Sequence, residues 1–287
     1  MLNKQQSRHK NKAFCCRTPC FLFLALLLLA VPARAQFVPP TTGGAAWGTA
    51  GCNMGGEPFS DAASLAQAVF SPKVMIGLAY VRPFALKELA YKSFTFISPV
   101  GEFGVTAAAY SHSGNATFNQ QYTSAGYAMH LGRDIALGLT LNYFYTGADD
   151  PHYNSLRMLS ATISLAARPA EGLTVDFNLF NPYAVSFGAE QRAQSPALAT
   201  LGASYRVAPQ LLARVQIDKE LTSKLQVRAG LEYTFLEHFK LRAGVANEPL
   251  VYAFGMAVDW DGYGVDLAAQ LHPVLGFTPQ VASYFSF

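Results

Sequence analysis

A hydroxyl and an imidazole side chain lie close together in the segment from Tyr110 to Asn115, which reads Tyr-Ser-His-Ser-Gly-Asn. Hydrolytic enzymes use such pairs, with the hydroxyl as nucleophile and the imidazole as base. On a strand, the two groups need a spacing of i and i+2 to share a face. Ser111 and Ser113 are both adjacent to His112, so their side chains would point to the opposite face. All three residues are expected to begin a loop, which could bend them together, but we expect the protein not to be an enzyme.

The histidines do not have the spacing of a metal site. After residue 100 they are scattered along the chain, at His112, His130, His152, His238 and His272. None has the close pairing that a zinc site prefers. His152 lies beside Asp149 and Asp150 and could bind a divalent ion weakly, but a solvated loop is the simpler interpretation. Since a phosphate-cradling Gly loop with its following Lys is also missing, we expect no metal and no cofactor.

The first 35 residues differ in composition from the rest of the chain. They carry six basic side chains and no acidic one, and Phe21 to Val31 form a run of 11 apolar residues. Ala33-Arg34-Ala35 then has the small–x–small pattern that signal peptidase recognises. The apolar run is too short for a helix that crosses a bilayer. We predict that residues 1–35 are a secretory signal peptide and that the mature chain starts near Gln36, with a retained membrane anchor as the alternative.

The chain after residue 35 is apolar and weakly charged. Of all 287 residues, 51% are apolar and 14% are charged. Taking the six basic side chains of the first segment from the total of 21 leaves 15 against 18 acidic ones, a net charge of −3. This composition excludes a disordered chain, a coiled coil and a disulfide scaffold, and nucleic acid is not an expected partner. Cys52 has no cysteine partner after residue 35, so we expect a buried small side chain there.

Apolar residues after position 72 alternate with small or polar ones. From Ile135 to Tyr145, every odd-numbered residue is Ile, Leu or Tyr, whereas the even-numbered ones are mostly Ala, Gly, Thr and Asn. The same pattern recurs over 225–235 and 252–260. A period of two indicates strands, and about 10 residues tilted by about 45° cross a bilayer. The second face is small and sparsely charged, which fits the interior of a small barrel better than the outside of a soluble β-sandwich.

We predict an all-β fold, a transmembrane antiparallel β-barrel of about 14 strands over residues 73–287. Connections after even-numbered strands are short, as at Gly132-Arg133-Asp134, and those after odd-numbered strands are mostly longer, as at 112–120, 147–154 and 181–196. Outer-membrane barrels have short periplasmic turns and longer external loops, and an even strand number leaves both termini on the periplasmic side. We therefore expect a bacterial outer-membrane location, with both mature termini periplasmic and membrane lipid around the barrel.

Residues 36–72 do not alternate. They contain Pro39-Pro40, Gly43-Gly44 and Gly55-Gly56, and then an Ala-rich stretch from Ser60 to Phe70. Ser60 could cap a short helix, which Ser71-Pro72 would end. A barrel of this width encloses more space than side chains alone fill. We predict that residues 36–72 form a small N-terminal hatch or plug, with a flexible periplasmic tail as the alternative.

Charged residues on the second face are predicted to point into the barrel lumen. By alternation they are Asp176, Arg206, Arg214, Asp218, Arg228, Glu232, Arg242, Asp259 and Asp266. Five of the nine are acidic and four are basic, so their charges nearly cancel. An ion-selective pore usually carries an excess of one sign, whereas paired charges brace a wall or hold a plug. We interpret these residues as a lumen network, with the lining of a solute path as the alternative.

The C-terminus is the most specific local signal. The chain ends Ser283-Tyr284-Phe285-Ser286-Phe287, which places Phe285 and Phe287 on one face with an aromatic residue last. This ending resembles that of bacterial outer-membrane barrels, whose assembly machinery recognises it. We predict that Phe285 and Phe287 are a barrel-assembly signal and that the barrel-assembly machinery is a partner.

Several short motifs resemble the PorV/PorQ group within the FadL-like family of outer-membrane proteins. Residues 45–74 are similar to the family's Gly-rich hatch and small-residue helix, and residues 264–287 to its last two strands. The segments 82–89 (RPFALKEL) and 177–182 (FNLFNP) also resemble family patterns. Ser71-Pro72-Lys73 departs from the family's Asn-Pro-Ala step, and the loops are shorter. The resemblance implies a 14-stranded barrel with an N-terminal hatch.

The same resemblance implies two alternative functions. One is a FadL-like conduit or binding barrel for an apolar ligand, which enters from outside and is released inward or sideways when the hatch moves. The other is a PorV/PorQ-like accessory barrel of a type IX secretion system, which docks cargo or translocon subunits. The expected partner is an apolar ligand in the first case and secretion-system proteins in the second. The short loops favour the conduit or an accessory role with an unknown cargo.

Overall fold

The computed structural model describes residues 43–54, 64–101, 104–115, 117–148, 155–183, 185–187, 197–220 and 224–287. The predicted signal peptide, Ser60 and the loop around His152 lie outside these residues. Two short helices come first, α2 (Gly44–Gly48) and α3 (Leu65–Ala68), and two 3₁₀ turns, η3 (Pro83–Ala85) and η4 (Lys87–Leu89), follow the first strand. The strands are β1 (Met75–Val81), β2 (Tyr91–Val100), β3 (Gly104–Gly114), β4 (Phe118–His130), β5 (Ile135–Ala148), β6 (Leu156–Ala170), β7 (Leu173–Phe180), β8 (Val185–Phe187), β9 (Leu198–Ala208), β10 (Leu211–Glu220), β11 (Gln226–Leu236), β12 (Phe239–Asn247), β13 (Leu250–Trp260), β14 (Tyr263–His272) and β15 (Gly276–Ser286).

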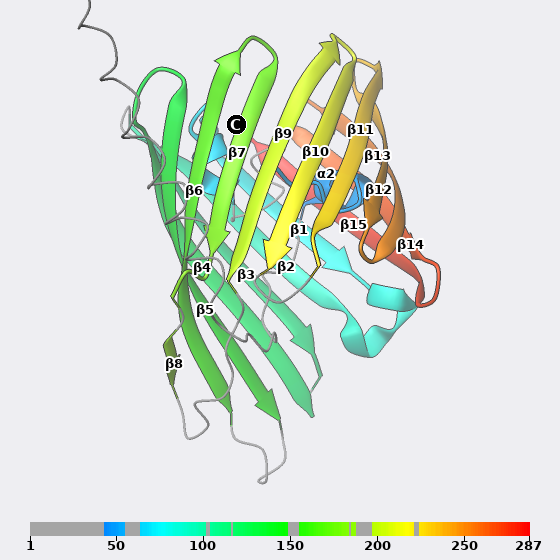
Figure 1. The fold of residues 1–287 in the computed structure, drawn as a ribbon. Coiled ribbons are helices and arrows are strands. Elements are labelled where there is room, and N and C mark those ends of the chain that lie inside the picture. Colours follow the sequence, from blue (N-terminus) through cyan, green and yellow to red (C-terminus); the bar gives the residue numbers. More distant parts are fainter. Residues whose placement is uncertain are drawn as a thin grey trace, which may run out of the picture. The chain divides into compact units, whose positions relative to one another are not determined.

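The strands form one antiparallel sheet that closes on itself (Figure 1). β1 pairs with both β2 and β15, and the pairing of β5 with β6 completes the ring. β8 does not add a position to the ring, because it continues β7 along β6: Phe180 lies opposite Thr162 and Val185 opposite Leu159. The 15 strand segments therefore make a closed barrel of 14 strands, as the alternation and turn lengths predicted.

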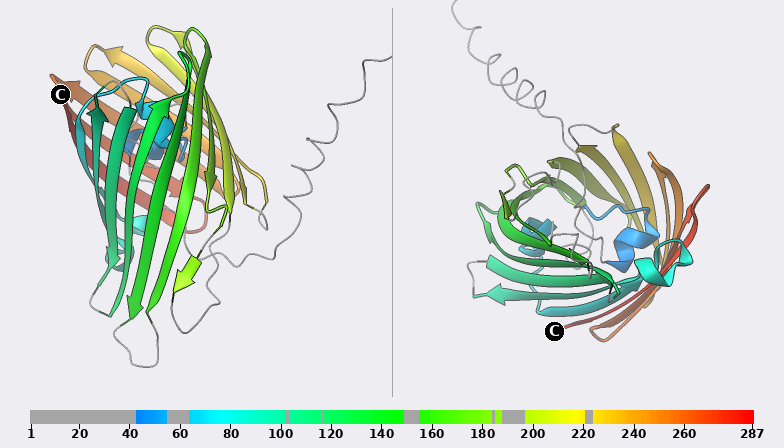
Figure 2. Two further views of the ribbon diagram at one scale, coloured as in Figure 1. Left: turned by 90° about the vertical axis from the view of Figure 1, so that its left-hand side faces the viewer. Right: turned by 90° about the horizontal axis from the view of Figure 1, so that it is seen from below.

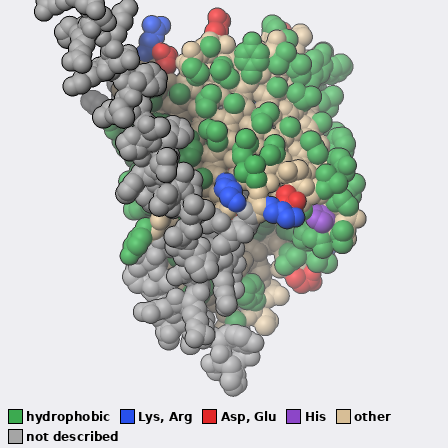
Figure 3. Space-filling view, viewed as in Figure 1, with side chains coloured by type: hydrophobic (Ala, Val, Ile, Leu, Met, Phe, Trp, Pro, Cys, Tyr) green, Lys and Arg blue, Asp and Glu red, His purple; other side chains and the backbone are tan. Residues whose placement is uncertain are grey.

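The two faces of the strands differ as the sequence predicted. On β5, Leu137, Leu139 and Leu141 are exposed on the outer face, whereas Ala136 and Thr140 are buried on the inner one. Figure 3 shows hydrophobic side chains spread over the outer surface, with few charged ones among them. Such a surface suits lipid, and a closed sheet pairs the backbone groups that lipid cannot hydrogen-bond.

Short turns gather at one end of the barrel, which we call the short-turn end. One of them joins β13 to β14 through Asp261-Gly262, with φ angles of 47° and 85°. Two consecutive positive φ values are the mark of the tight hairpin turn that matches strand twist. Met75 at the start of β1 pairs with Ser286 at the end of β15, so both ends of the barrel chain also lie there. We call the opposite end the long-loop end.

The loop predicted over 112–120 is wrong in extent. β3 continues to Gly114 and β4 begins at Phe118, so His112 and both neighbouring serines lie within a strand. The ladder extends because Asn115 closes a tight turn: its Oδ1 accepts hydrogen bonds from the backbone N–H groups of Thr117 and Phe118, each at 3.0 Å. Adjacent strand residues point to opposite faces, so this geometry separates the hydroxyls from the imidazole.

The described parts of the N-terminal segment lie inside the ring, as the view along the barrel shows (Figure 2). α2 packs against β12 to β15, and α3 packs against β3 to β6 on the other side. No helix among the described residues has the length and apolar character needed to cross a membrane. The segment 43–54, which we call the plug segment, and α3 thus fill interior space that the strands leave open.

The outward apolar face leads to a test of how the barrel sits in lipid. Leu139, 53% exposed, lies at the middle of the outer apolar row of β5, and Ile135, 46% exposed, lies at its end. We expect Leu139→Arg to lower the free energy of unfolding from phospholipid vesicles by about 2–4 kcal/mol, because a charge at the bilayer midplane is costly. Ile135→Arg, on the same strand and face, should cost about 0–1 kcal/mol. Equal losses at both positions would contradict the assignment of this face to lipid.

Candidate functional site in the barrel lumen

Glycines on the inner wall leave room for the plug segment. A Cβ atom at Gly244 would lie 2.7 Å from Cα of Thr49 and 2.8 Å from the backbone nitrogen of Ala50. A Cβ at Gly255 would lie 2.9 Å from Cα of Gly48. These distances are too short for carbon and nitrogen atoms in contact. The main chain of the plug segment therefore passes along the wall where the wall has no side chains.

Wall side chains hydrogen-bond the backbone of the plug segment. Arg228 donates from Nη1 to the carbonyl oxygen of Gly51 at 2.9 Å. Gln216 accepts through Oε1 from the backbone N–H groups of Asn53 and Met54, at 3.0 and 3.3 Å. Hydrogen bonds of this kind contribute about 1 kcal/mol each, and somewhat more where a guanidinium donates. The plug segment is therefore held by several modest polar contacts.

Asp218 orients both of these wall residues. Its carboxylate accepts two hydrogen bonds from Nε2 of Gln216, at 2.9 and 3.1 Å, and its Oδ2 lies 3.0 Å from Nε of Arg228. Because a carboxylate can only accept hydrogen bonds, Asp218 binds the NH₂ group of the Gln216 side chain. The Oε1 atom of Gln216 therefore points to the plug segment. The sequence predicted Asp218 and Arg228 as lumen residues. It missed Gln216, although Gln216 lies two residues before Asp218 and shares its face.

A second network lies beside the first. Glu232 on β11 accepts from Arg242 at 2.7 Å and from Arg214 at 3.3 Å, and Arg242 also pairs closely with Asp266 on β14. All four side chains are buried and come from four different strands. Burying charges is costly unless they are paired, so these ion pairs hold the strands in a fixed arrangement around α2. Alternation predicted all four as lumen residues, and the structure brings them together.

The remaining predicted lumen residues are dispersed. Asp259 is half-buried, pairs with Lys240 at 2.6 Å and accepts a hydrogen bond from the hydroxyl of Tyr284. Asp176 is buried on β7, whereas Arg206 is exposed at the short-turn end. Lys240 was missed at the sequence level, although it lies two residues before Arg242 on the same face.

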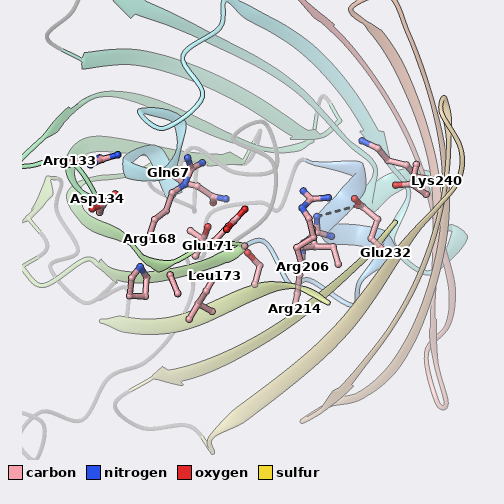
Figure 4. Close-up of a pocket in the computed structure, with 17 residues that line it drawn as sticks. Gln67, Arg133, Asp134, Arg168, Glu171, Leu173, Arg206, Arg214, Glu232 and Lys240 are labelled. Carbon is pink, nitrogen blue, oxygen red and sulfur yellow. Dashed lines mark hydrogen bonds and ion pairs between the residues drawn. The ribbon is translucent and has the colours of Figure 1, made fainter. Parts of the chain in front are cut away.

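A cavity of about 830 Å³ lies at the short-turn end (Figure 4). It is lined by the turn between β4 and β5, by residues 168–174 of the β6–β7 hairpin, by Gln67 of α3, and by inward side chains of β9 to β12. Its charged lining residues are basic at Arg133, Arg168, Arg206, Arg214 and Lys240, and acidic at Asp134, Glu171 and Glu232. Alternation could not predict the members that lie in turns, since they have no strand face.

The inner wall toward the long-loop end carries an apolar cluster on β4 to β7. Its buried members are Tyr122, Phe144, Met158 and Phe180. The ring centroids of Tyr122 and Phe144 are 4.9 Å apart, and those of Phe144 and Phe180 are 6.0 Å apart. We call this group the aromatic cluster. Large apolar side chains are a minority on the inner wall, where Met75 and Ile97 pack near α3, and this group joins aromatic rings into a distinct region of the lumen.

The lumen also contains a cysteine, Cys52, and several carboxylates. Cys52 is 1% exposed within the plug segment, and burial raises the pKa of its thiol to about 12. A thiol in that state is a poor nucleophile at neutral pH, in agreement with the structural role expected for it. Among the residues that the structure describes, no three His, Cys, Asp or Glu side chains group closely enough to hold a metal ion.

The two C-terminal phenylalanines lie at the short-turn end. Phe287 is exposed and its ring centroid is 5.1 Å from that of Phe285, which in turn contacts Tyr263 at 4.4 Å. Phe285 pairs in the ladder with Ile76, which faces outward. The two rings therefore belong to an aromatic group on the outer face at this rim.

Comparisons with known proteins show the fold. The sequence matches no protein-family model and no curated protein. Similar solved structures include a FadL homologue of Pseudomonas aeruginosa (TM-score 0.55, 11% identity, 88% of this chain and 98% of that one), the Pseudomonas putida toluene transporter TodX (0.58, 10%, 85% and 96%) and the monoaromatic hydrocarbon channel CymD (0.55, 12%, 85% and 96%). The chain thus has the 14-stranded fold of FadL-type outer-membrane barrels, while its resemblance to PorV and PorQ stays a prediction.

The fit between glycines and plug segment leads to a second test, with Cys52 as reporter. We expect Gly244→Ala to displace residues 49 and 50, because the added methyl group would meet backbone atoms. Cys52 should then react with a maleimide at least about tenfold faster in the folded barrel, through greater exposure and a thiol pKa nearer its ordinary value. The matched control is Gly132→Ala, where a Cβ has open space. Unchanged labelling in Gly244→Ala would contradict the described packing.

Proposed function

We propose that this protein is an integral outer-membrane barrel that conducts or binds a small apolar compound, and that the plug segment closes its lumen. The observation that carries this proposal is the aromatic cluster, four large apolar side chains that face inward on adjacent strands. Apolar walls with a few placed polar groups are typical of sites for apolar ligands. Asn142 supplies such a polar group, since its Oδ1 accepts a hydrogen bond from the hydroxyl of Tyr122 at 2.9 Å.

The arrangement along the barrel suggests a path. Phe144 lies four residues from the end of β5 at the long-loop end, which we place outside the cell. The plug segment crosses the middle of the wall at Gly244 and Gly255, and the polar cavity follows at the short-turn end, which we place in the periplasm. A compound that enters from outside would meet the aromatic cluster first. Its release would require the plug segment to exchange its few hydrogen bonds for water.

Two kinds of observation support the ligand class and the location. TodX is a toluene transporter and CymD a monoaromatic hydrocarbon channel, and both have this fold. The apolar outer face and the exposed C-terminal Phe287 fit a barrel in the outer membrane, with Phe285 and Phe287 as the signal for its assembly machinery. In this proposal both ends of the barrel chain, near Met75 and Ser286, lie on the periplasmic side.

The aromatic cluster leads to a test with a matched pair of substitutions at one position. In cells that carry the protein in an outer membrane, we expect Phe144→Asn to lower the initial uptake rate of radiolabelled toluene about tenfold, because an amide would stand in an apolar binding surface. Phe144→Leu keeps the site apolar and should retain most of the rate. Folding of both variants is checked by heat-modifiable gel mobility. Equal uptake by all three proteins would overturn the role of the cluster.

Purification of the full-length protein in mild detergent, with mass spectrometry of bound lipids and co-purified proteins, tests the function as a whole. We expect a barrel that carries an apolar compound at a substantial fraction of one per chain. Secretion-system subunits recovered in near-stoichiometric amounts, without such a compound, would overturn the conduit and favour the accessory barrel that the sequence resemblance also implies.

A further inference from the structure

Arg214 is a buried charged side chain whose guanidinium is incompletely paired. Its side chain is 1% exposed, and its Nη2 donates to Glu232 at 3.3 Å. Its Nε and Nη1 atoms are buried and have no hydrogen-bond partner. Buried N–H groups of a cation cost free energy unless an acceptor satisfies them. The unpaired donors therefore indicate that an acceptor belongs beside Arg214.

The carboxylate that Arg214 contacts is shared. Glu232 also accepts from Nε of Arg242 at 2.7 Å, which is the shorter and stronger of the two contacts. Arg242 has a second acidic partner in Asp266, whereas the described structure gives Arg214 no other carboxylate. Glu232 alone therefore leaves part of the positive charge of Arg214 uncompensated.

Arg214 lines the cavity of about 830 Å³ at the short-turn end, and other basic residues line the same cavity (Figure 4). The lining residues include Arg133, Arg168 and Arg206, for which the structure gives no ion pair within the described chain, and Lys240, which pairs with Asp259. Since Asp259 neutralises Lys240, four basic residues stand against three acidic ones, which leaves a small excess of positive charge around the cavity. Such an excess attracts an anion.

We propose that this cavity binds a small organic monoanion, and that Arg214 receives its carboxylate. Charge-assisted hydrogen bonds from a guanidinium to a carboxylate are short and strong, and a carboxylate placed beside Arg214 would satisfy the buried Nε and Nη1 donors, which have no acceptor in the described chain. The acidic lining residues Asp134, Glu171 and Glu232 disfavour a dianion, so a single carboxylate fits better than phosphate. This inference goes beyond the proposed function: the cavity lies at the opposite end from the aromatic cluster, and binding needs no transport.

Calorimetric titration of the full-length barrel in a non-ionic detergent tests the ligand class. The probes are benzoate, its neutral isostere benzamide, and inorganic phosphate. We expect benzoate to bind one per chain, benzamide to bind at least about tenfold more weakly, and phosphate to bind more weakly than benzoate. Added salt should weaken benzoate binding. Benzamide that binds as tightly as benzoate would overturn the proposal without any variant, and phosphate that binds more tightly would overturn the choice of a carboxylate.

Substitutions then test the residue. Arg214→Gln should weaken benzoate binding at least about tenfold, and Arg214→Lys by less, since the charge remains. Lys224→Gln is the matched control, because Lys224 is an exposed basic residue between β10 and β11 at the long-loop end. Unchanged binding in a folded Arg214→Gln barrel would overturn the role of Arg214. If the Arg214→Gln barrel fails to assemble, Arg206→Gln tests the site instead. We expect this substitution to weaken benzoate binding about twofold or more, and unchanged binding would overturn the proposal.

Failure of this proposal and failure of the conduit are distinguishable. Loss of benzoate binding with intact toluene uptake in the Arg214→Gln barrel would support a separate anion site. Normal toluene uptake by a wild-type barrel that does not bind benzoate would overturn the anion site but not the conduit.

Discussion

Closure of the sheet is the constraint on which the rest of this structure depends. When β5 pairs with β6 and β1 with β15, no strand edge remains free, and every strand acquires one face toward the lumen and one away from it. The outer face can then be apolar because the backbone needs no water. The inner face is under a different constraint, because a ring of 14 strands encloses more volume than the side chains of its strands fill.

The main chain of the N-terminal segment, rather than large side chains of the strands, fills much of this interior volume. Glycines such as Gly244 and Gly255 let the main chain of the plug segment approach the wall, and buried ion pairs on β10 to β14 hold that wall in register. The buried ion pairs and the plug segment depend on each other. α2 covers the side chains of Asp266 and Arg242, and the ion pair between these two residues holds the wall in place around α2. α3 packs on the opposite side with mainly apolar contacts. The two described parts of the N-terminal region are thus held by different forces.

Chemical character changes along the lumen. The long-loop end carries the aromatic cluster, and the middle of the lumen holds the plug segment through hydrogen bonds to the wall. The short-turn end contains the cavity with its basic residues. An apolar body and an anionic group would each find a suitable surface, at opposite ends of the same barrel. The cavity is assembled from turns and strands far apart in the chain, and only closure makes them neighbours.

The sequence by itself determined the barrel class, the strand number, the outward and inward faces, and the location of the short turns. All of these follow from local signals, a period of two along each strand and turn residues such as Asp261-Gly262. Local signals also misjudged the loop over 112–120, where Asn115 closes a turn too tight to recognise from polarity. The tertiary structure decided which inward residues meet: Gln216 with the plug segment, Lys240 with Asp259, and turn residues Arg133 and Glu171 with Arg214 around one cavity. The physical reason is that these partners depend on the register and closure of the whole ring, and alternation along one strand carries no information about its neighbours across the lumen.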